Sequence, residues 1–239
     1  MLQNYTLFNQ NLNDITQQKV LINTINAHSF NTLKQDETFN KALQASNILL
    51  PDGISMVLAM RLLTGQKIQK IAGADLFEYE MKRLNTIGGK CFFLGSSEST
   101  LKKIRERAKE EYPNVKIHTY SPPFRIEFSQ IENQIMIDEI NEVKPDTLFV
   151  GMTAPKQEKW AYNHFEELEV GHVCCIGAVF DFYAGTVKRA PQWMIQIGME
   201  WLYRLISEPR RMWRRYIIGN TKFIWHILLE KFNLSSLLA

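Results

Sequence analysis

The chain has 239 residues, of which 45% are apolar and 22% are charged. This balance excludes a disordered chain, and the length fits one α/β domain with room for a small addition. The formal net charge is +3, but nine basic and three acidic residues follow Val187, so residues 1–187 carry a net charge of −3. A basic end of this kind predicts a polyanionic partner, either a membrane surface or a nucleic acid.

The cysteines and the apolar runs indicate in which cellular compartment the protein works. Cys91, Cys174 and Cys175 are odd in number and lack the spacing of zinc ligands, so we expect a reducing cytoplasm and no metal or cofactor. The first 14 residues show neither the basic nor the apolar region of a signal peptide. The longest late apolar run, 223–229, is far shorter than the roughly 20 residues of a transmembrane helix. We therefore expect a protein that lies on a membrane without crossing it.

Alternating strand and helix patterns organise the first three quarters of the chain. Apolar and β-branched runs predict strands at residues 19–28, 47–50, 90–94, 115–119, 147–150 and 172–176. Helical patterns occupy residues 30–46, 54–63, 98–112, 131–143 and 157–168. The helix at 54–63 is apolar on nearly every side, so we expect it to be buried. Strand, glycine and helix recur in this order, which predicts a Rossmann-like α/β fold: a parallel sheet with helices on both faces.

The pattern changes at Ala190, after which the sequence reads as helical throughout. Pro191 suits the first turn of a helix, and Pro209 interrupts the pattern. Two further helical pieces are predicted at 210–218 and 221–232, on either side of Gly219 and Asn220. We therefore expect residues 1–189 to form a catalytic core and residues 190–239 a C-terminal helical appendage.

The predicted appendage interleaves aromatic with basic side chains. These residues are Trp201, Tyr203, Arg204, Arg210, Arg211, Trp213, Arg214, Arg215, Tyr216, Lys222 and Trp225. Trp and Tyr favour the membrane interface and Arg attracts anionic headgroups, so the pattern predicts peripheral attachment. The same residues also fit a solvated helix face packed on the core, or a nucleic-acid-binding surface.

Polar groups follow several predicted strands, at the edge where open α/β sheets bind ligands. Gly95 and Gly151 begin loops whose N–H groups can hold a phosphate, although a plain tight turn is the alternative. Asp52, between Pro51 and Gly53, follows an apolar strand. Its carboxylate can act as a general base, or it can cap the helix that follows.

A dense polar block, 153–160, lies at another strand-to-helix junction. Lys156 and Gln157 can hydrogen-bond a diphosphate or a nucleobase there, or simply form a capped first helical turn. Single polar residues in loops are further candidates, with a solvated surface as the alternative: Lys70, Asp75, Asp181, Lys188 and Arg189. No Asp-x-Asp triplet is present, so we expect cationic side chains and amides, rather than a metal, to neutralise a leaving group.

Taken in order, these segments resemble the WecG/TagA/CpsF glycosyltransferases of bacterial cell-surface polysaccharide synthesis. The similarity runs from about residue 20 to about residue 225. It rests on Thr24-x-Asn26, Pro51-Asp52-Gly53, Gly73-x-Asp75-Leu76, Phe93-Leu94-Gly95, Val150-Gly151, Pro155-Lys156-Gln157-Glu158-Lys159-Trp160, Gly177 to Phe182, Gly185 to Pro191, Glu200 to Leu205 and Glu208-Pro209-Arg210-Arg211. The PKQEKW and KRAP…EWLYRL…EPRR blocks are the most specific of these.

The resemblance implies an inverting transferase with a Rossmann-like core. Such an enzyme moves a sugar from a UDP-sugar, often N-acetylmannosamine or its uronic acid, to a polyprenyl-diphosphate-linked sugar on the inner face of the plasma membrane. Asp52 would be the base, with Thr24 and Asn26 lining the same pocket. The substrate-binding candidates are Lys70, Asp75, Gly95, Gly151, Pro155, Lys156, Gln157, Glu158, Asp181, Arg189, Arg210, Arg211, Arg214 and Arg215.

Two features depart from the family pattern. Lys70 stands where many members carry Arg, and Lys lacks the bidentate fork of a guanidinium. The segment 120–124 looks more like the polysaccharide-type members than the teichoic-acid type. Two other function classes remain open from the residues alone: a nucleotide-responsive membrane adaptor without catalysis, and a nucleic-acid-binding α/β protein. A monomer and a homo-oligomer both fit the sequence.

Overall fold

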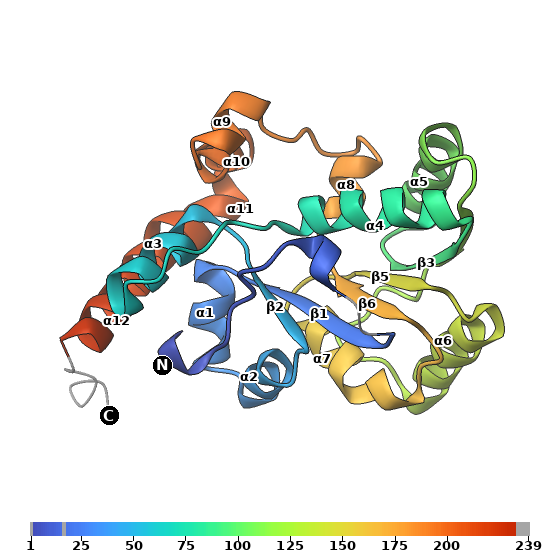
Figure 1. Cartoon of the computed structure of the whole chain (residues 1–239), viewed down its shortest axis with the longest axis horizontal. Coiled ribbons are helices and arrows are strands. Elements are labelled where there is room, and N and C mark those ends of the chain that lie inside the picture. The colour runs from blue at the N-terminus through green and yellow to red at the C-terminus, as the bar shows by residue number, and fades with distance from the viewer. Residues whose placement is uncertain (1, 16–17, 233–239) are drawn as a thin grey trace.

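The computed structural model describes residues 2–15 and 18–232, and a six-stranded parallel sheet forms its centre (Figure 1). The strands are β1 (Val20–Ile25), β2 (Ile48–Pro51), β3 (Lys90–Gly95), β4 (Lys116–Tyr120), β5 (Thr147–Gly151) and β6 (His172–Cys175). Their order is β2-β1-β6-β5-β3-β4, and every neighbouring pair is parallel. The predicted Rossmann-like α/β fold is confirmed. All six strands end at the same edge of the sheet, where ligands bind in this class of fold.

Helices cover both faces of the sheet (Figure 1). On one face lie α4 (Gly73–Ile87), α5 (Glu98–Glu111) and α8 (Val179–Tyr183), and on the other lie α6 (Gln130–Val143) and α7 (Lys156–His164). Successive strand residues point to opposite faces, so Phe93 packs with Phe77 of α4, whereas its neighbour Phe92 packs with Ile137 of α6. This alternation explains why the central strands β3, β5 and β6 are apolar on both sides.

A third group of helices lies beyond β1 and β2. It comprises α1 (Ala27–Leu33), α2 (Glu37–Gln44), α3 (Ile54–Thr64) and the last helix, α12 (Gly219–Lys231). Phe223 of α12 is buried in one apolar cluster with Phe30 of α1 and Met56 of α3. At the far end of α12, the Glu230 carboxylate accepts hydrogen bonds from the N–H groups of Leu2 and Gln3, at 2.9 and 3.1 Å. The last helix is thereby attached to the first residues of the chain.

The C-terminal segment reaches α12 through a run of short helices. These are α9 (Gln192–Gln196), α10 (Glu200–Ser207), α11 (Pro209–Trp213) and a π-helical turn, Arg214–Ile218. Gly219 has right-handed helical backbone angles, so the π-helical turn continues directly into α12. The predicted break at Gly219 and Asn220 is therefore wrong. The Asn31 side chain donates a hydrogen bond to the Gly219 carbonyl at 2.7 Å, which holds this point against α1.

Three other helical predictions differ from the structure. Residues 30–46 form two helices, because the Asp36 carboxylate accepts a hydrogen bond from the Phe39 N–H at 2.9 Å and starts α2 there. Helix α4, which begins at a glycine, was not predicted. Helix α3 is not buried all round, since Ile54, Leu58 and Leu62 are exposed. Short 3₁₀ turns complete the fold at Leu2–Asn4, Leu12–Asp14 and Phe165–Glu167.

The packing of α12 on α1 predicts a modest stability effect for a single ring. The Phe30 and Phe223 rings pack edge to face, with their centroids 5.4 Å apart and an angle of 89° between the ring planes. Replacing Phe223 with Leu keeps an apolar side chain but removes this ring pair, so we expect a loss of about 1 kcal/mol. For a chain of this size the thermal midpoint should fall by about 2–4 °C. An unchanged midpoint in differential scanning calorimetry would show that α12 contributes little to the core.

Candidate active site

Asp52 and Asn26 lie side by side because they directly follow neighbouring strands. Ile25 of β1 is paired with Pro51 of β2, and the Asp52 N–H donates to the Ile25 carbonyl at 2.9 Å. The Asn26 side chain caps α1, accepting hydrogen bonds from the N–H groups of His28 and Ser29 at 3.0 and 3.1 Å. Its amide also hydrogen-bonds the Asp52 carboxylate. Thr24 is half-buried near the end of β1, two residues before Asn26.

The Asp52 carboxylate does not cap the helix that follows it. The N-cap position of α3 is Gly53, and no side chain makes a capping hydrogen bond there. Gly53 has a φ of 111°, a backbone conformation that favours glycine. The sharp turn at Gly53 therefore leaves the Asp52 carboxylate available for another role.

Burial and the charges around Asp52 together set the pKa of its carboxyl group. Burial is the largest cause that raises the pKa of Asp52 to about 6, and the carboxylate of Glu200 on α10 raises it further. Lys70, the Asn26 amide and Arg215 act in the opposite direction. Lys70 is brought to this edge because the Ile71 N–H donates to the Pro51 carbonyl at 3.1 Å. A carboxylate with a pKa near 6 is ionised at neutral pH and is still a useful base there.

Arginines of the C-terminal segment supply positive charge beside Asp52. Arg215, in the π-helical turn, acts on Asp52 and also on His28 at the start of α1. Burial and the Arg215 charge together lower the pKa of His28 to about 4, so His28 is neutral at pH 7. Among the described residues, the buried Nε atoms of Arg189, Arg204 and Arg215 have no hydrogen-bond acceptor. Buried N–H groups without an acceptor are costly, so they favour an incoming anion.

Arg189 is also linked to Glu200. The Arg189 Nε lies 3.6 Å from a carboxylate oxygen of Glu200. Glu200, Arg204 and His28 were not predicted as site residues. Glu200 and Arg204 stand in the EWLYRL motif block, but their approach to β1 and β2 depends on how the C-terminal segment folds back.

Gln157 lies at the neighbouring strand ends of β5 and β6. Its side-chain oxygen accepts a hydrogen bond from the Met152 N–H at 3.2 Å, and its amide donates to Glu158 at 2.9 Å. A Cβ at Gly177, just after β6, would come within 3.3 Å of the Gln157 side chain. Glu158 is 2% exposed, and burial raises its pKa to about 7. Glu158 thus lies beneath the surface and orients Gln157.

Several other candidates have clear local structural contacts. A Cβ at Gly95 would lie 2.5 Å from the Gly151 carbonyl oxygen, and one at Gly151 would lie 2.5 Å from the Phe180 ring. The ends of β3, β5 and α8 therefore pack too closely for any side chain at these positions. Asp75 accepts a hydrogen bond from the Ala72 N–H at 2.8 Å at the start of α4. The Asp181 carbonyl accepts one from the Thr186 hydroxyl at 3.1 Å.

The remaining candidates are spread over the surface. The Lys156 ammonium, next to Pro155, donates to the Arg125 carbonyl at 2.5 Å and lies 3.5 Å from the centroid of the Phe128 ring. Arg210, Arg211 and Arg214 are exposed, and Arg211 is paired with Glu208 at 3.0 Å. Of the four arginines at 210–215, Arg215 is therefore the one that the structure brings to Asp52.

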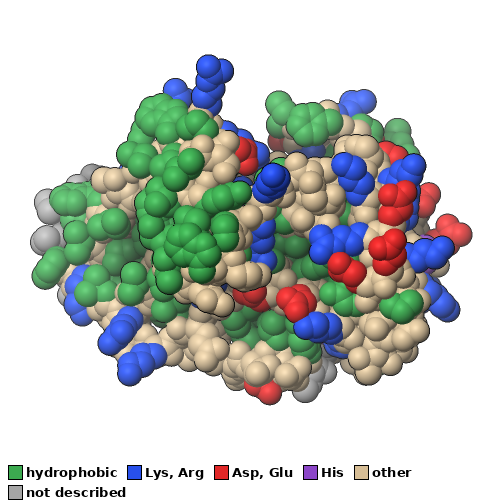
Figure 2. Space-filling view, turned by 90° about the horizontal axis from the view of Figure 1, so that it is seen from above, with side chains coloured by type: hydrophobic (Ala, Val, Ile, Leu, Met, Phe, Trp, Pro, Cys, Tyr) green, Lys and Arg blue, Asp and Glu red, His purple; other side chains and the backbone are tan. Residues whose placement is uncertain are grey.

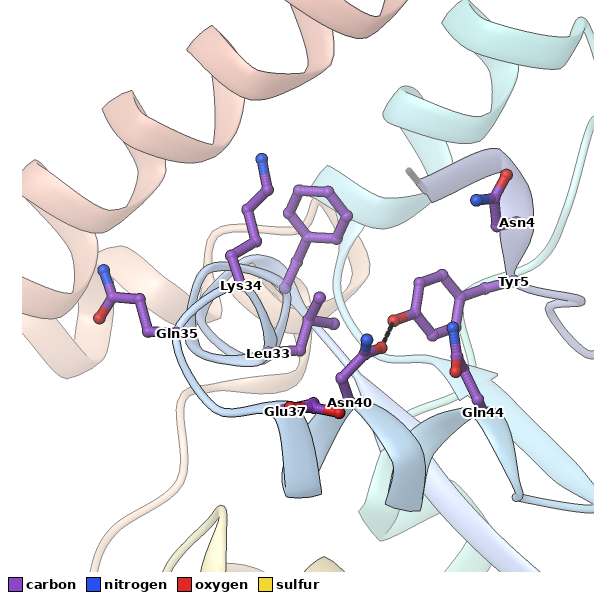
Figure 3. Close-up of a pocket in the computed structure, with 9 residues that line it drawn as sticks. Asn4, Tyr5, Leu33, Lys34, Gln35, Glu37, Asn40 and Gln44 are labelled. Carbon is purple, nitrogen blue, oxygen red and sulfur yellow. Dashed lines mark hydrogen bonds between the residues drawn. The ribbon is translucent and has the colours of Figure 1, made fainter. Parts of the chain in front are cut away.

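A cavity of about 510 Å³ lies away from this cluster, between the N-terminal residues, α1 and α2 (Figure 3). Its wall includes Tyr5, whose hydroxyl donates a hydrogen bond to Asn40, and also Lys34 and Gln44. None of the candidate site residues lines it. The cavity is therefore separate from the strand ends that carry Asp52.

The doubly wound parallel sheet, with a half-buried carboxylate and cations gathered at its carboxyl edge, defines an α/β enzyme of the Rossmann-like class. Within this class, the chain belongs to the Glycosyl transferase WecG/TagA/CpsF family, whose sequence pattern matches residues 3–237. The match spans both the sheet and the C-terminal helices. The family identified by resemblance is thus confirmed, and with it a transferase rather than a non-catalytic adaptor.

Curated relatives agree with this assignment. The chain is 32% identical over 213 residues to the N-acetylglucosaminyldiphosphoundecaprenol N-acetyl-beta-D-mannosaminyltransferase of Bacillus subtilis (strain 168), covering 89% of this chain and 80% of that protein. It is 30% identical to the protein of the same name in Bacillus spizizenii, covering 81% and 73%. The Staphylococcus aureus (strain MW2) protein of that name is 26% identical, covering 90% and 81%.

Proposed function

We propose that this enzyme transfers a sugar of the N-acetylmannosamine type, with inversion, from a UDP-sugar to a polyprenyl-diphosphate-linked sugar. The named relatives carry out the corresponding transfer to N-acetylglucosaminyldiphosphoundecaprenol. The observation that carries the proposal is the position of Asp52, at a strand end between Asn26, Lys70 and Arg215. A base and a set of cations are the two components that such a transfer requires.

In the proposed reaction, Asp52 takes the proton of the acceptor hydroxyl. The hydroxyl oxygen forms a bond to the anomeric carbon on the face opposite the diphosphate, while the bond from that carbon to the diphosphate oxygen breaks. UDP leaves with the electron pair of that bond. Arg215 and Lys70 stabilise the negative charge that develops on the departing diphosphate. Asn26 holds the Asp52 carboxylate toward the acceptor.

The donor is proposed to lie along the ends of β5 and β6. Gln157 is fixed there by its hydrogen bonds to Met152 and Glu158. A Cβ at Gly177 would lie 3.3 Å from the Gln157 side chain, so the loop after β6 lies directly beside this amide. Backbone N–H groups and a side-chain amide at this edge suit a nucleotide or a sugar hydroxyl.

The acceptor's lipid implies contact with the membrane surface, which we place on the cytoplasmic face. Within residues 2–15 and 18–232, no helix is both long and apolar enough to span a bilayer. Large apolar side chains are nevertheless exposed on the C-terminal helices, among them Trp193, Ile206, Trp213, Ile217 and Trp225. Exposed aromatic and arginine side chains in one segment support peripheral binding.

The direct test is UDP release over a panel of UDP-sugars, with a short-chain polyprenyl-diphosphate-N-acetylglucosamine acceptor. Acceptor-dependent release with one donor would establish the reaction and identify that donor. The proposal would be contradicted if a folded protein that binds UDP released no UDP with any donor of the panel, even after the first sugar of the acceptor is changed.

Glu200 predicts a shift in the pH dependence of this reaction. Catalysis needs ionised Asp52, so kcat/KM should fall as the pH drops through about 6. Because the Glu200 charge raises the pKa of Asp52, Glu200→Gln should move this acidic limb to lower pH. Glu208→Gln is the matched control, since Glu208 is paired with Arg211 instead. The measurement is kcat/KM from pH 4.5 to 8. Identical profiles for the wild type and the two variants would show that Glu200 does not raise the pKa of Asp52.

A further inference from the structure

Helix α3 exposes an apolar stripe on a helix of the core, beside the candidate base. Ile54, Leu58 and Leu62 are 40%, 56% and 44% exposed and recur every four residues, so they lie on one face. The opposite face of α3 carries Met56, Met60 and other buried residues of the α1 and α12 cluster. The exposed stripe therefore does not take part in the packing of the core. It begins two residues after Asp52.

The α3 stripe adjoins the exposed apolar side chains of the C-terminal helices. Helix α12 packs on α3 and exposes Ile224, Trp225 and Leu228. The turn between α9 and α10 reaches the start of α3, where a Cβ at Gly198 would lie 3.0 Å from Ile54. Seen from above, hydrophobic side chains gather on the side that carries α3 and the C-terminal helices, whereas acidic and basic side chains are mixed on the other half (Figure 2).

Basic side chains accompany this apolar face. Arg61 and Lys67 are exposed at the end of α3, and Arg210, Arg211 and Arg214 are exposed on the C-terminal helices. A second copy of the chain, bound through the same face about a twofold axis, would bring two sets of like charges together. An anionic bilayer has the opposite charge beside its apolar interior, so it complements this surface better than a second copy does.

We propose that the α3 stripe inserts into the acyl-chain region of an anionic membrane together with the C-terminal helices. The core then contributes directly to membrane attachment, and Asp52, just before α3, is held at the level of the lipid headgroups. This inference rests on the proposed function in one respect, that the acceptor diphosphate is presented at that level. Binding of the enzyme to a bilayer that contains no acceptor is a separate expectation.

The test compares two pairs of exposed apolar residues, each spaced by four positions on a helix. Leu58→Gln with Leu62→Gln alters α3 while keeping good helix formers. Ile131→Gln with Ile135→Gln, at residues 74% and 42% exposed on α6, is the matched control on a helix that covers the sheet. With vesicles of phosphatidylglycerol and phosphatidylcholine, the α3 variant should bind about tenfold more weakly than the wild type. The α6 variant should bind as the wild type does.

Activity measurements separate attachment from catalysis. The α3 variant should keep wild-type turnover with a water-soluble short-chain acceptor and lose turnover with a long-chain acceptor in vesicles. Unchanged vesicle binding by the α3 variant would overturn the inference. So would conversion of a wild-type dimer to a monomer, measured by light scattering, with vesicle binding unaltered. A wild type that binds vesicles through α3 but releases no UDP would contradict the proposed function and leave this surface in place.

Discussion

Replacing Asp52 with Asn is expected to lower kcat about a thousandfold, because the amide cannot accept the proton of the acceptor hydroxyl. The substitution preserves the shape of the side chain and its neighbours Asn26 and Arg215. UDP binding should therefore stay within a few-fold of the wild type. Single-turnover measurements with the short-chain acceptor, beside titration calorimetry with UDP, would measure both quantities. Retained turnover would exclude Asp52 as the base.

The same variant should be more stable than the wild type at neutral pH. The pKa of Asp52 rises from 3.8 in the unfolded chain to about 6 in the folded protein, so its ionised form opposes folding. This cost is absent below pH 3.8, develops between pH 3.8 and 6, and reaches about 3 kcal/mol above pH 6. Asn carries no such charge, so the thermal midpoint of the variant should exceed that of the wild type at pH 7 but not at pH 4. A lower midpoint at pH 7 would mean that Asp52 stabilises the fold instead.

Replacing Arg215 with Gln should lower kcat by about a hundredfold to a thousandfold, the usual effect of losing one preorganised group on a developing negative charge. Arg215 also lowers the pKa of Asp52. The acidic limb of kcat/KM should therefore move to higher pH, opposite to the shift expected for Glu200→Gln. Arg215→Lys should recover part of the rate, since it keeps the charge but loses the planar fork.

Arg210→Gln is the matched control for Arg215, because Arg210 is an exposed arginine five residues earlier in the same segment. It should retain most of the turnover with a short-chain acceptor. Equal losses of turnover in the Arg210 and Arg215 variants would indicate that these arginines act through the overall positive charge of the segment rather than through a specific contact. A normal rate in the Arg215 variant would place the leaving-group contact elsewhere in the cluster.

The sheet and part of the candidate site could be predicted from the sequence because both depend on local pattern. Most strands are short apolar runs followed by a glycine or a polar turn, whereas the edge strand β4 mixes polar and apolar residues. Asp52 and Asn26 directly follow β2 and β1, so parallel pairing brings them together without any longer-range information. Helix α4 was missed because it begins at Gly73, a residue that ordinarily ends a helix.

The charges around Asp52 could not be predicted, because they come from a segment that returns to the core over a long sequence distance. Nothing near Glu200 or Arg215 shows that these side chains face β2. The apolar residues of a helix also did not show which of its faces is buried. Helix α3 is apolar on nearly all sides, which ordinarily means burial, yet one stripe of it is exposed. The composition of a helix gives the amount of apolar surface, but it does not show which other element of the fold covers that surface.

The attachment of Glu230 to Leu2 and Gln3 has a consequence for how the enzyme is made. This contact joins positions 228 residues apart, so it forms only after residue 230 has left the ribosome. The strands and most of the sheet helices can assemble earlier, during synthesis. Arg215 and α12 are synthesised after β6, so a nascent chain with a finished sheet still has an incomplete charge cluster. Synthesis thus separates the folding of the scaffold from the completion of the site.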